Sequence, residues 1–177
     1  GRDAGYSNQT ADGNVFIGEY AGRNTTNSNN TFLGTSSGWQ VTSGQKNTIL
    51  GRYNGNQNGL DIRTLSNRIV LSDGDGNPRI YVDNDGKIGF GKVNNISDVA
   101  HTGASISNTG WGMFCRDSGT ALYVGRNINT GTLVEFWQAG GLKGNISTNG
   151  TSVSYNTSSD YRLKENVDYT WDATARL

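Results

Sequence analysis

The chain has 177 residues, with 15 basic and 15 acidic side chains and a hydrophobic content of only 33%. This charge balance leaves no basic surface for nucleic acid, and no apolar run approaches the roughly 18 residues of a membrane-spanning helix. Large apolar residues are too few for a thick core within one chain, although four Trp, eight Tyr and five Phe argue against disorder. We therefore expect several chains to share a core.

Four related segments fill residues 1–65. Their glycine-bounded turns begin at residues 1, 18, 34 and 51 and read GRDAG, GEYAG, GTSSG and GRYNG. A short apolar run precedes each of the last three turns, as NVFIG, NTFLG and NTILG. Each unit of 16 or 17 residues predicts a short strand, a turn and a polar connection. Because such a unit cannot bury a face alone, we expect the units to stack as coils of a β-roll or β-solenoid.

Stacking would place equivalent residues above one another. We expect Asn14, Asn30 and Asn47 to form a ladder of side-chain amides between coils. The apolar pairs that follow them are expected to stack in register: Phe16 and Ile17, Phe32 and Leu33, and Ile49 and Leu50. These units resemble the head repeats of trimeric autotransporter adhesins and of many phage tail fibres. A plain β-meander with accidental similarity is the alternative.

Residues 66–91 change from repeats to a hairpin segment. Three β-rich runs are separated by DGDGNP and DNDG, which are strong turn sequences. Asp73, Asp75 and Asn77 have the spacing of a calcium loop, but Pro78 stands where that loop needs glycine. We therefore expect turns here and no metal site. The stretch PRIYVDNDGKIGFG resembles a segment common in phage tail-fibre shafts.

A polar, weakly patterned stretch occupies residues 92–110, and a linker or exposed loop is expected there. Its one histidine, His101, has no second ligand or nucleophile nearby and is a poor sign of metal binding or catalysis. Strand patterns return in residues 111–159, at GMFCRD, ALYVGRN, TLVEFWQAGG and LKGNIS. These runs predict a compact antiparallel distal domain.

Receptor contact is expected within residues 92–145 and not on the regular repeats. Aromatic faces and planar hydrogen-bond donors suit glycans, and the candidate residues are Trp111, Arg116, Arg126 and Trp137. For each aromatic residue, filling a core is the alternative role.

The chemistry changes near the end of the chain, where charged residues follow a serine pair in SSDYRLKENV. This stretch resembles the junction that opens the intramolecular chaperone, or peptidase S74, domain of phage tail fibres and tailspikes. Its signature S-D-x-R-L-K is matched by Ser159, Asp160, Arg162, Leu163 and Lys164. The resemblance implies that three chains assemble and that the precursor then cuts its Ser159–Asp160 bond, with Ser159 and Lys164 as the catalytic pair. An ordinary charged helix start is the alternative.

By the same resemblance, residues 160–177 are the start of a truncated chaperone domain. A lysine acts as a base only when its pKa falls from about 10.4 toward neutrality, and burial lowers it in this way. We therefore expect single-turnover serine–lysine endopeptidase activity in the full precursor only. Attack by Ser159 Oγ on its own carbonyl would form a four-membered ring. A neighbouring protomer, water or a prior acyl shift are the open alternatives.

The resemblances together imply an elongated, homotrimeric, all-β fibre of a phage virion, made in the host cytoplasm. Such a fibre would bind a host cell-surface glycan or outer-membrane receptor, without a cofactor. An upstream fibre region is expected because the chain begins within a repeat. Two alternatives stay open: a polysaccharide-degrading tailspike and a bacterial trimeric surface adhesin. A tailspike needs paired carboxylates, and the strand-region acids Asp117 and Glu135 have no evident partner.

Overall fold

The computed structural model describes residues 1–93, 96–97, 100–127 and 129–157, which form strands and turns without a helix. The predicted all-β class is therefore confirmed. No helix in this part of the chain is long and apolar enough to cross a membrane. The chain divides into two compact units, Gly1–Ala121 and Leu122–Leu177.

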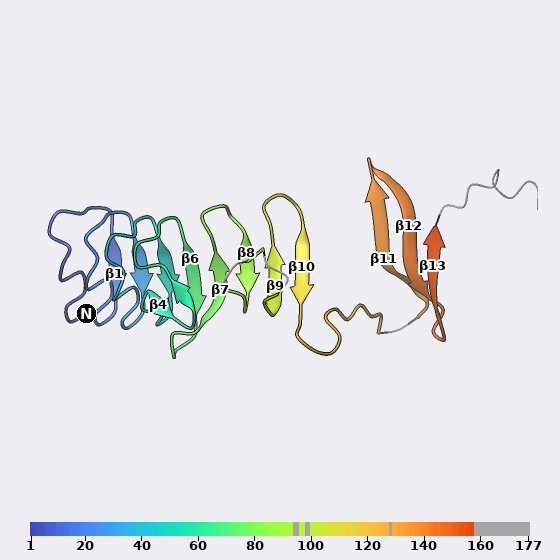
Figure 1. Ribbon diagram of the computed structural model, residues 1–177, viewed down its shortest axis with the longest axis horizontal. Helices are drawn as coiled ribbons and strands as arrows, with labels where there is room; N and C mark the ends of the chain where they lie inside the picture. Colours follow the sequence, from blue (N-terminus) through green and yellow to red (C-terminus); the bar gives the residue numbers. More distant parts are fainter. Residues whose placement is uncertain (94–95, 98–99, 128, 158–177) are drawn as a thin grey trace, which may run out of the picture. The chain divides into compact units, whose positions relative to one another are not determined.

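Eight strands of the first unit form one sheet in the order β1-β2-β3-β6-β7-β8-β9-β10 (Figure 1). The first four strands pair in parallel, and the later pairs are antiparallel. The bounds are β1 Val15–Ile17, β2 Thr31–Leu33, β3 Thr48–Leu50, β6 Ile69–Ser72, β7 Pro78–Val82, β8 Ile88–Phe90, β9 Gly103–Ile106 and β10 Gly112–Cys115.

Successive repeats are joined at both their strands and their turns. Phe16 lies opposite Phe32, and Phe32 lies opposite Ile49, so the strands pair without a shift in register. The turns form a second set of bonds, in which the N–H groups of Gly5, Gly22 and Gly38 donate to the carbonyls of Ala21, Ser37 and Tyr53. Each repeat therefore rests on the next through equivalent backbone bonds.

In each of β2, β3 and β6, the second residue of the strand points into the unit. Phe32, Ile49 and Val70 are fully buried at the centre of the core. Leu33 and Leu50 stack in register as expected but face outward, with 41% and 46% of their surface exposed. The twofold alternation of a strand explains this division, because neighbouring side chains point to opposite faces.

The three stacked asparagines bond from side chain to backbone. Asn14 Oδ1 accepts the backbone N–H of Asn30 at 2.8 Å, and Asn30 Oδ1 accepts that of Asn47 at 3.0 Å. Asn47 Oδ1 continues the series to the N–H of Arg68 at 2.9 Å. The repeat pattern predicts contacts between the amides themselves, and the structure differs. The difference follows from the need of each buried backbone N–H for an acceptor, which the side chain of the preceding coil supplies.

Replacing Asn30 with Leu is expected to destabilise the repeats by about 2–6 kcal/mol per chain, because two buried polar groups would each lose a partner. These groups are the Asn47 N–H and the Gly44 carbonyl, which accepts from Asn30 Nδ2 at 3.1 Å. Guanidinium unfolding would measure the loss. Asn24→Leu is the matched control, since the half-buried Asn24 side chain makes no hydrogen bond within the described residues. Equal stability of the two variants would contradict the role given to the ladder.

Glycine is required at both ends of the GTSSG turn. A Cβ atom on Gly34 would lie 2.2 Å from the carbonyl oxygen of Gly51, and one on Gly38 would lie 2.4 Å from the Phe32 ring. Both glycines also have positive φ angles, of 134° and 62°. The close approach of neighbouring coils and of the buried ring therefore explains why glycine bounds the turn.

The fourth coil is irregular. Consecutive ladder asparagines are 17 residues apart in the third coil, but the next ladder step spans 21 residues. The longer coil contains a small hairpin of β4, Asn56–Gln57, and β5, Leu60–Asp61. The buried Tyr53 hydroxyl donates to the Leu60 carbonyl at 2.8 Å, and burial raises the pKa of this phenol. Tyr53 thereby holds the hairpin to the core.

The predicted hairpins of residues 66–91 are confirmed by the antiparallel pairing of β6, β7 and β8. Asp73 organises the first turn, because its carboxylate accepts the N–H groups of Asp75 at 3.1 Å and Asn77 at 2.8 Å and also pairs with Arg79. Hydrogen bonds from Asn77 and the pairing with Arg79 hold the Asp73 pKa below its usual range. These oxygens therefore fix the turn, as DGDGNP predicted.

Two segments differ from the expected strand pattern. The predicted linker contains β9, Gly103–Ile106, which pairs with both β8 and β10. Its residues, GASI, are too small and too few to give a clear apolar signal, so the adjacent strands decide its conformation. Residues 121–127, expected as a strand, form none. A strand requires a hydrogen-bonding partner as well as suitable residues.

The second unit contains one antiparallel sheet of three strands, β11 Gly131–Gln138, β12 Gly141–Thr148 and β13 Val153–Thr157. Val134, Phe136, Ile146 and Tyr155 lie on one face of this sheet, and Glu135, Asn145 and Asn156 lie on the other. No residue in 122–157, leaving aside the undescribed position 128, is buried. The described part of this unit thus has a sheet but no core of its own.

Candidate functional site

An apolar row crosses the outward face of the whole eight-stranded sheet. The paired residues, one from each strand, are Ile17, Leu33, Leu50, Leu71, Ile80, Phe90, Ala104 and Phe114. We call this set the outer row. Strands in a sheet lie about 4.8 Å apart, so the row is about 34 Å long.

The outer row is exposed along much of its length. Ile17 and Phe114, at the two ends, are 57% and 54% exposed, and Leu50 is 46% exposed. A parallel row beside it contains the exposed residues Val15, Ile69 and Ile106. Isolated apolar residues are normal on a surface, but contiguous apolar patches mark interaction sites. This face therefore has the character of an interface.

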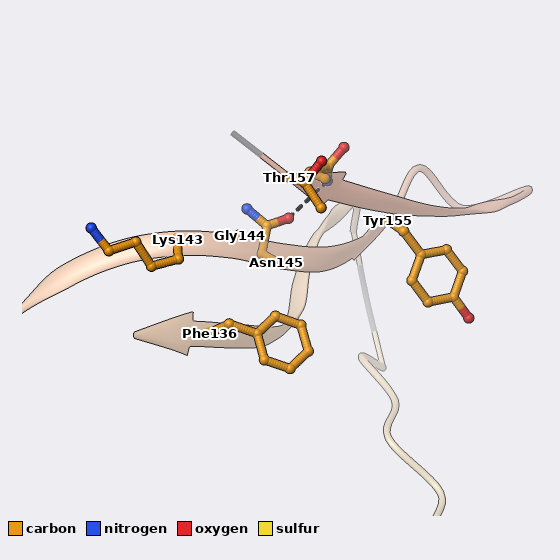
Figure 2. A pocket seen from close by; sticks show the side chains of 7 residues that line it. Phe136, Lys143, Gly144, Asn145, Tyr155 and Thr157 are labelled. Atoms are coloured by element: carbon orange, nitrogen blue, oxygen red, sulfur yellow. Dashed lines mark hydrogen bonds between the residues drawn. The ribbon is translucent and has the colours of Figure 1, made fainter. Parts of the chain in front are cut away.

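The sheet of the second unit has a similar bare face. Val134 lies opposite Ile146, which lies opposite Tyr155, and Phe136 lies on the same side. Phe136 and Tyr155 are 53% and 78% exposed. On the opposite face, Asn156 Nδ2 donates to Asn145 Oδ1 at 2.8 Å. Figure 2 shows the rings of Phe136 and Tyr155 on the side of the sheet away from the Asn145 side chain.

A shallow hollow of about 230 Å³ adjoins this sheet (Figure 2). Gly144 lies between Phe136 and Thr157 in the pairing of the three strands and adds no side chain of its own. The hollow is therefore part of the bare sheet face, and an apolar group from another molecule would fill it.

The four predicted receptor-binding residues divide between the units. Trp111 and Arg116 belong to the first, and Arg126 and Trp137 to the second. Each arginine bonds within its own segment, Arg116 to the Thr120 carbonyl at 3.2 Å and Arg126 to the Thr132 carbonyl at 3.4 Å. These contacts fix the arginines locally, and receptor binding by the four residues stays a prediction.

The tryptophans differ in exposure. Trp111 is half-buried, and its carbonyl accepts the Ser107 N–H at 2.9 Å. Trp137 is 61% exposed, and its indole N–H donates to Glu135 Oε2 at 2.9 Å. Glu135 is therefore engaged by an indole, whereas the other strand-region acid, Asp117, belongs to the first unit.

The predicted cleavage junction lies outside the described residues. This applies to the scissile bond between Ser159 and Asp160, to the catalytic partner Lys164, and to the motif residues Arg162 and Leu163. Their roles stay predictions that rest on the sequence.

Sequence reasoning missed a hollow of about 190 Å³ beside the irregular fourth coil. It is lined by Ser36, Trp39, Arg52, Asn54, Gln57 and Asp75. The signal in the sequence was the break in the repeat. The segment NGNQNGLDIR lengthens the fourth repeat, and Trp39 follows the equivalent turn of the third repeat. An inserted hairpin on a regular stack creates a local concavity, because the neighbouring coils lack a matching projection.

Three features of the described residues are candidate functional surfaces. They are the two exposed apolar sheet faces and the polar hollow beside Trp39. Comparison of the chain with protein-family models, curated proteins and solved structures gave no significant match. The function therefore has to be argued from these features and from the sequence motifs.

Proposed function

We propose that the chain is the structural and receptor-binding part of a homotrimeric phage tail fibre. The observation that carries the proposal is the outer row, a continuous line of paired apolar side chains that one chain leaves exposed or half-buried. Three copies related by a threefold axis along the stack of coils would bring identical residues together in layers. Each coil would then contribute to a solenoid within one chain and to a shared core between chains.

The second unit supports the same arrangement. The apolar face of a sheet has to be buried against another layer to contribute to stability. The described residues 122–157 contain no buried side chain that could supply this layer. Three such sheets around an axis would cover one another with Val134, Phe136, Ile146 and Tyr155.

The biological role follows from the sequence resemblances. The fibre would be part of the virion, continue from an upstream fibre region and adhere to a host cell-surface glycan. A C-terminal chaperone would assemble the three chains and then leave by self-cleavage at Ser159–Asp160. The motif at Ser159 to Lys164 supports this reading over a bacterial adhesin, whereas the repeat pattern fits both.

Native mass spectrometry of the chain, matured from its full precursor, is expected to give three chains of 19.0 kDa each, less any residues removed by cleavage. The assembly should also unfold slowly in denaturant, because the chains must separate as they unfold. Multi-angle light scattering provides an independent mass in solution. A stable, folded monomer at micromolar concentration would overturn the proposal.

A further inference from the structure

Aromatic and arginine side chains form a column on the outside of the first three coils. The Arg23 guanidinium lies 5.2 Å from the ring centroid of Tyr6 and 5.9 Å from that of Tyr20. Tyr20 stacks on Trp39, with ring centroids 5.8 Å apart and planes inclined by 26°. The column ends at Trp39, because the equivalent position of the fourth coil is Asn56, at the start of the hairpin.

The end of this column leaves an indole surface open. Tyr20, from the preceding coil, covers one face of Trp39, which is still 38% exposed. The hollow of about 190 Å³ adjoins the same indole, and most of its other walls come from the following coil and the next turn. The contacts within the column hold the ring in a fixed orientation, so it forms a preorganised wall.

The remaining walls are polar and carry both donors and acceptors. Asn54 Oδ1 accepts the Asn56 N–H at 2.9 Å, and Gln57 Nε2 donates to the Asp75 carbonyl at 2.8 Å. The Asn54 NH₂ group and the Gln57 Oε1 atom therefore keep hydrogen-bonding capacity. In the described part of the chain, no hydrogen bond or ion pair engages the exposed guanidinium of Arg52 or the exposed carboxylate of Asp75.

We infer that this hollow binds one pyranose unit of a glycan. The apolar C–H face of a pyranose ring fits the open face of the Trp39 indole, while its hydroxyl groups match the mixed donors and acceptors of Arg52, Asn54, Gln57 and Asp75. One cation and one anion leave the lining without net charge, so uncharged hydroxyl groups are favoured over an anionic sugar. Pockets for drug-sized ligands have volumes of about 300–1,000 Å³, and this smaller hollow takes a single ring.

This inference deepens the proposed function, because it names a ligand class and its site, and it rests on that proposal only for the biological source of the glycan. It also places binding on the repeats, outside the range 92–145 that the sequence favoured. The two locations predict different effects of replacing Trp39 and Trp137, which are both exposed.

Saturation-transfer NMR with separate methyl pyranosides of glucose, galactose, mannose and N-acetylglucosamine provides the test. At least one of them should bind the wild-type protein. Trp39→Ala and Arg52→Ala are each expected to weaken that binding by about tenfold or more, as is typical for Trp and Arg at the centre of a site. Arg52 is exposed and bonds through its backbone only, so its variant keeps the fold.

The matched control is Tyr123→Ala, which removes an exposed aromatic side chain of the second unit outside the candidate receptor residues and is expected to leave binding unchanged. Lack of binding to all four pyranosides, or binding that survives both Trp39→Ala and Arg52→Ala, would overturn the inference. Loss of binding in Trp137→Ala alone would place the site in the second unit instead. Mass measurements on the same samples distinguish the two hypotheses. A trimer that binds no sugar would refute the pyranose site but not the fibre. A monomer that binds sugar would refute the fibre but not the site.

Discussion

We expect the wild type to be trimeric, and a protein carrying both Leu33→Asp and Leu50→Asp to be monomeric at the same concentration. Both leucines belong to the outer row, point away from the core of their own chain and are 41% and 46% exposed there. Burying a leucine side chain contributes about 1.5–3 kcal/mol, so losing two from each of three chains removes on the order of 10 kcal/mol per trimer. The aspartates would also place unpaired charges in an apolar interface.

Size-exclusion chromatography with light scattering measures this change directly. Thr64→Asp is the matched control, because it adds a charge at an exposed turn residue away from the outer row. Circular dichroism should show that the double variant keeps β structure, at least at low temperature, since Phe32 and Ile49 of the interior are untouched. A double variant that remains fully trimeric would exclude the outer row as the interface.

Complete loss of self-cleavage is expected when Ser159 or Lys164 is replaced with Ala in the full-length precursor. The first change deletes the hydroxyl group that the signature places at the scissile bond, and the second deletes the nearest candidate base. Lysine has a pKa of about 10.4 in water and must lose its proton to act as a base. An apolar pocket built with the chaperone would favour this neutral form.

Denaturing gels of the purified precursor would follow the two fragments over time. Glu165→Gln lies next to Lys164 but outside the signature, so it serves as a control that should cleave at the wild-type rate. Residues 1–177 alone are expected to stay intact, because the proposed chaperone domain would supply the walls that desolvate Lys164. Normal cleavage by the Lys164→Ala precursor would refute the serine–lysine pair, and loss of the last 18 residues from the short chain would refute the need for the chaperone.

The repeat could be predicted from the sequence because identical backbone geometry demands similar residues at each turn. Gly34 and Gly38 illustrate this, since close neighbours exclude a Cβ atom at both positions. The stacking of Phe32 on its neighbours followed from the same period. The sequence did not predict that the asparagine side chains bond to backbone N–H groups. A residue type shows its hydrogen-bonding capacity but not which partner lies nearer in space.

Features that depend on contacts between distant segments were not predictable. β9 is a strand because β8 and β10 lie on either side of it, and its own residues give only a faint pattern. The hollow beside Trp39 arises from a hairpin inserted in one coil and a turn from the following β-hairpin. Regular periodicity in the sequence does not reveal such a site, because the site lies at the one repeat whose length and residues depart from the pattern.

The side-chain-to-backbone ladder has a consequence for how this molecule can evolve. Asn14, Asn30 and Asn47 each present a side-chain oxygen as acceptor to the coil that follows. If one coil were duplicated or deleted, its neighbours could therefore form the same hydrogen bonds with the coils that then adjoin them. Gene duplication could thus change the reach of the protein in steps of about 4.8 Å while its ends stay as they are. Insertions within a coil, as at residues 56–61, would alter the outer surface without changing that step. The length of the stack and the shape of its outer surface could then change independently, although both are encoded in the same repeats.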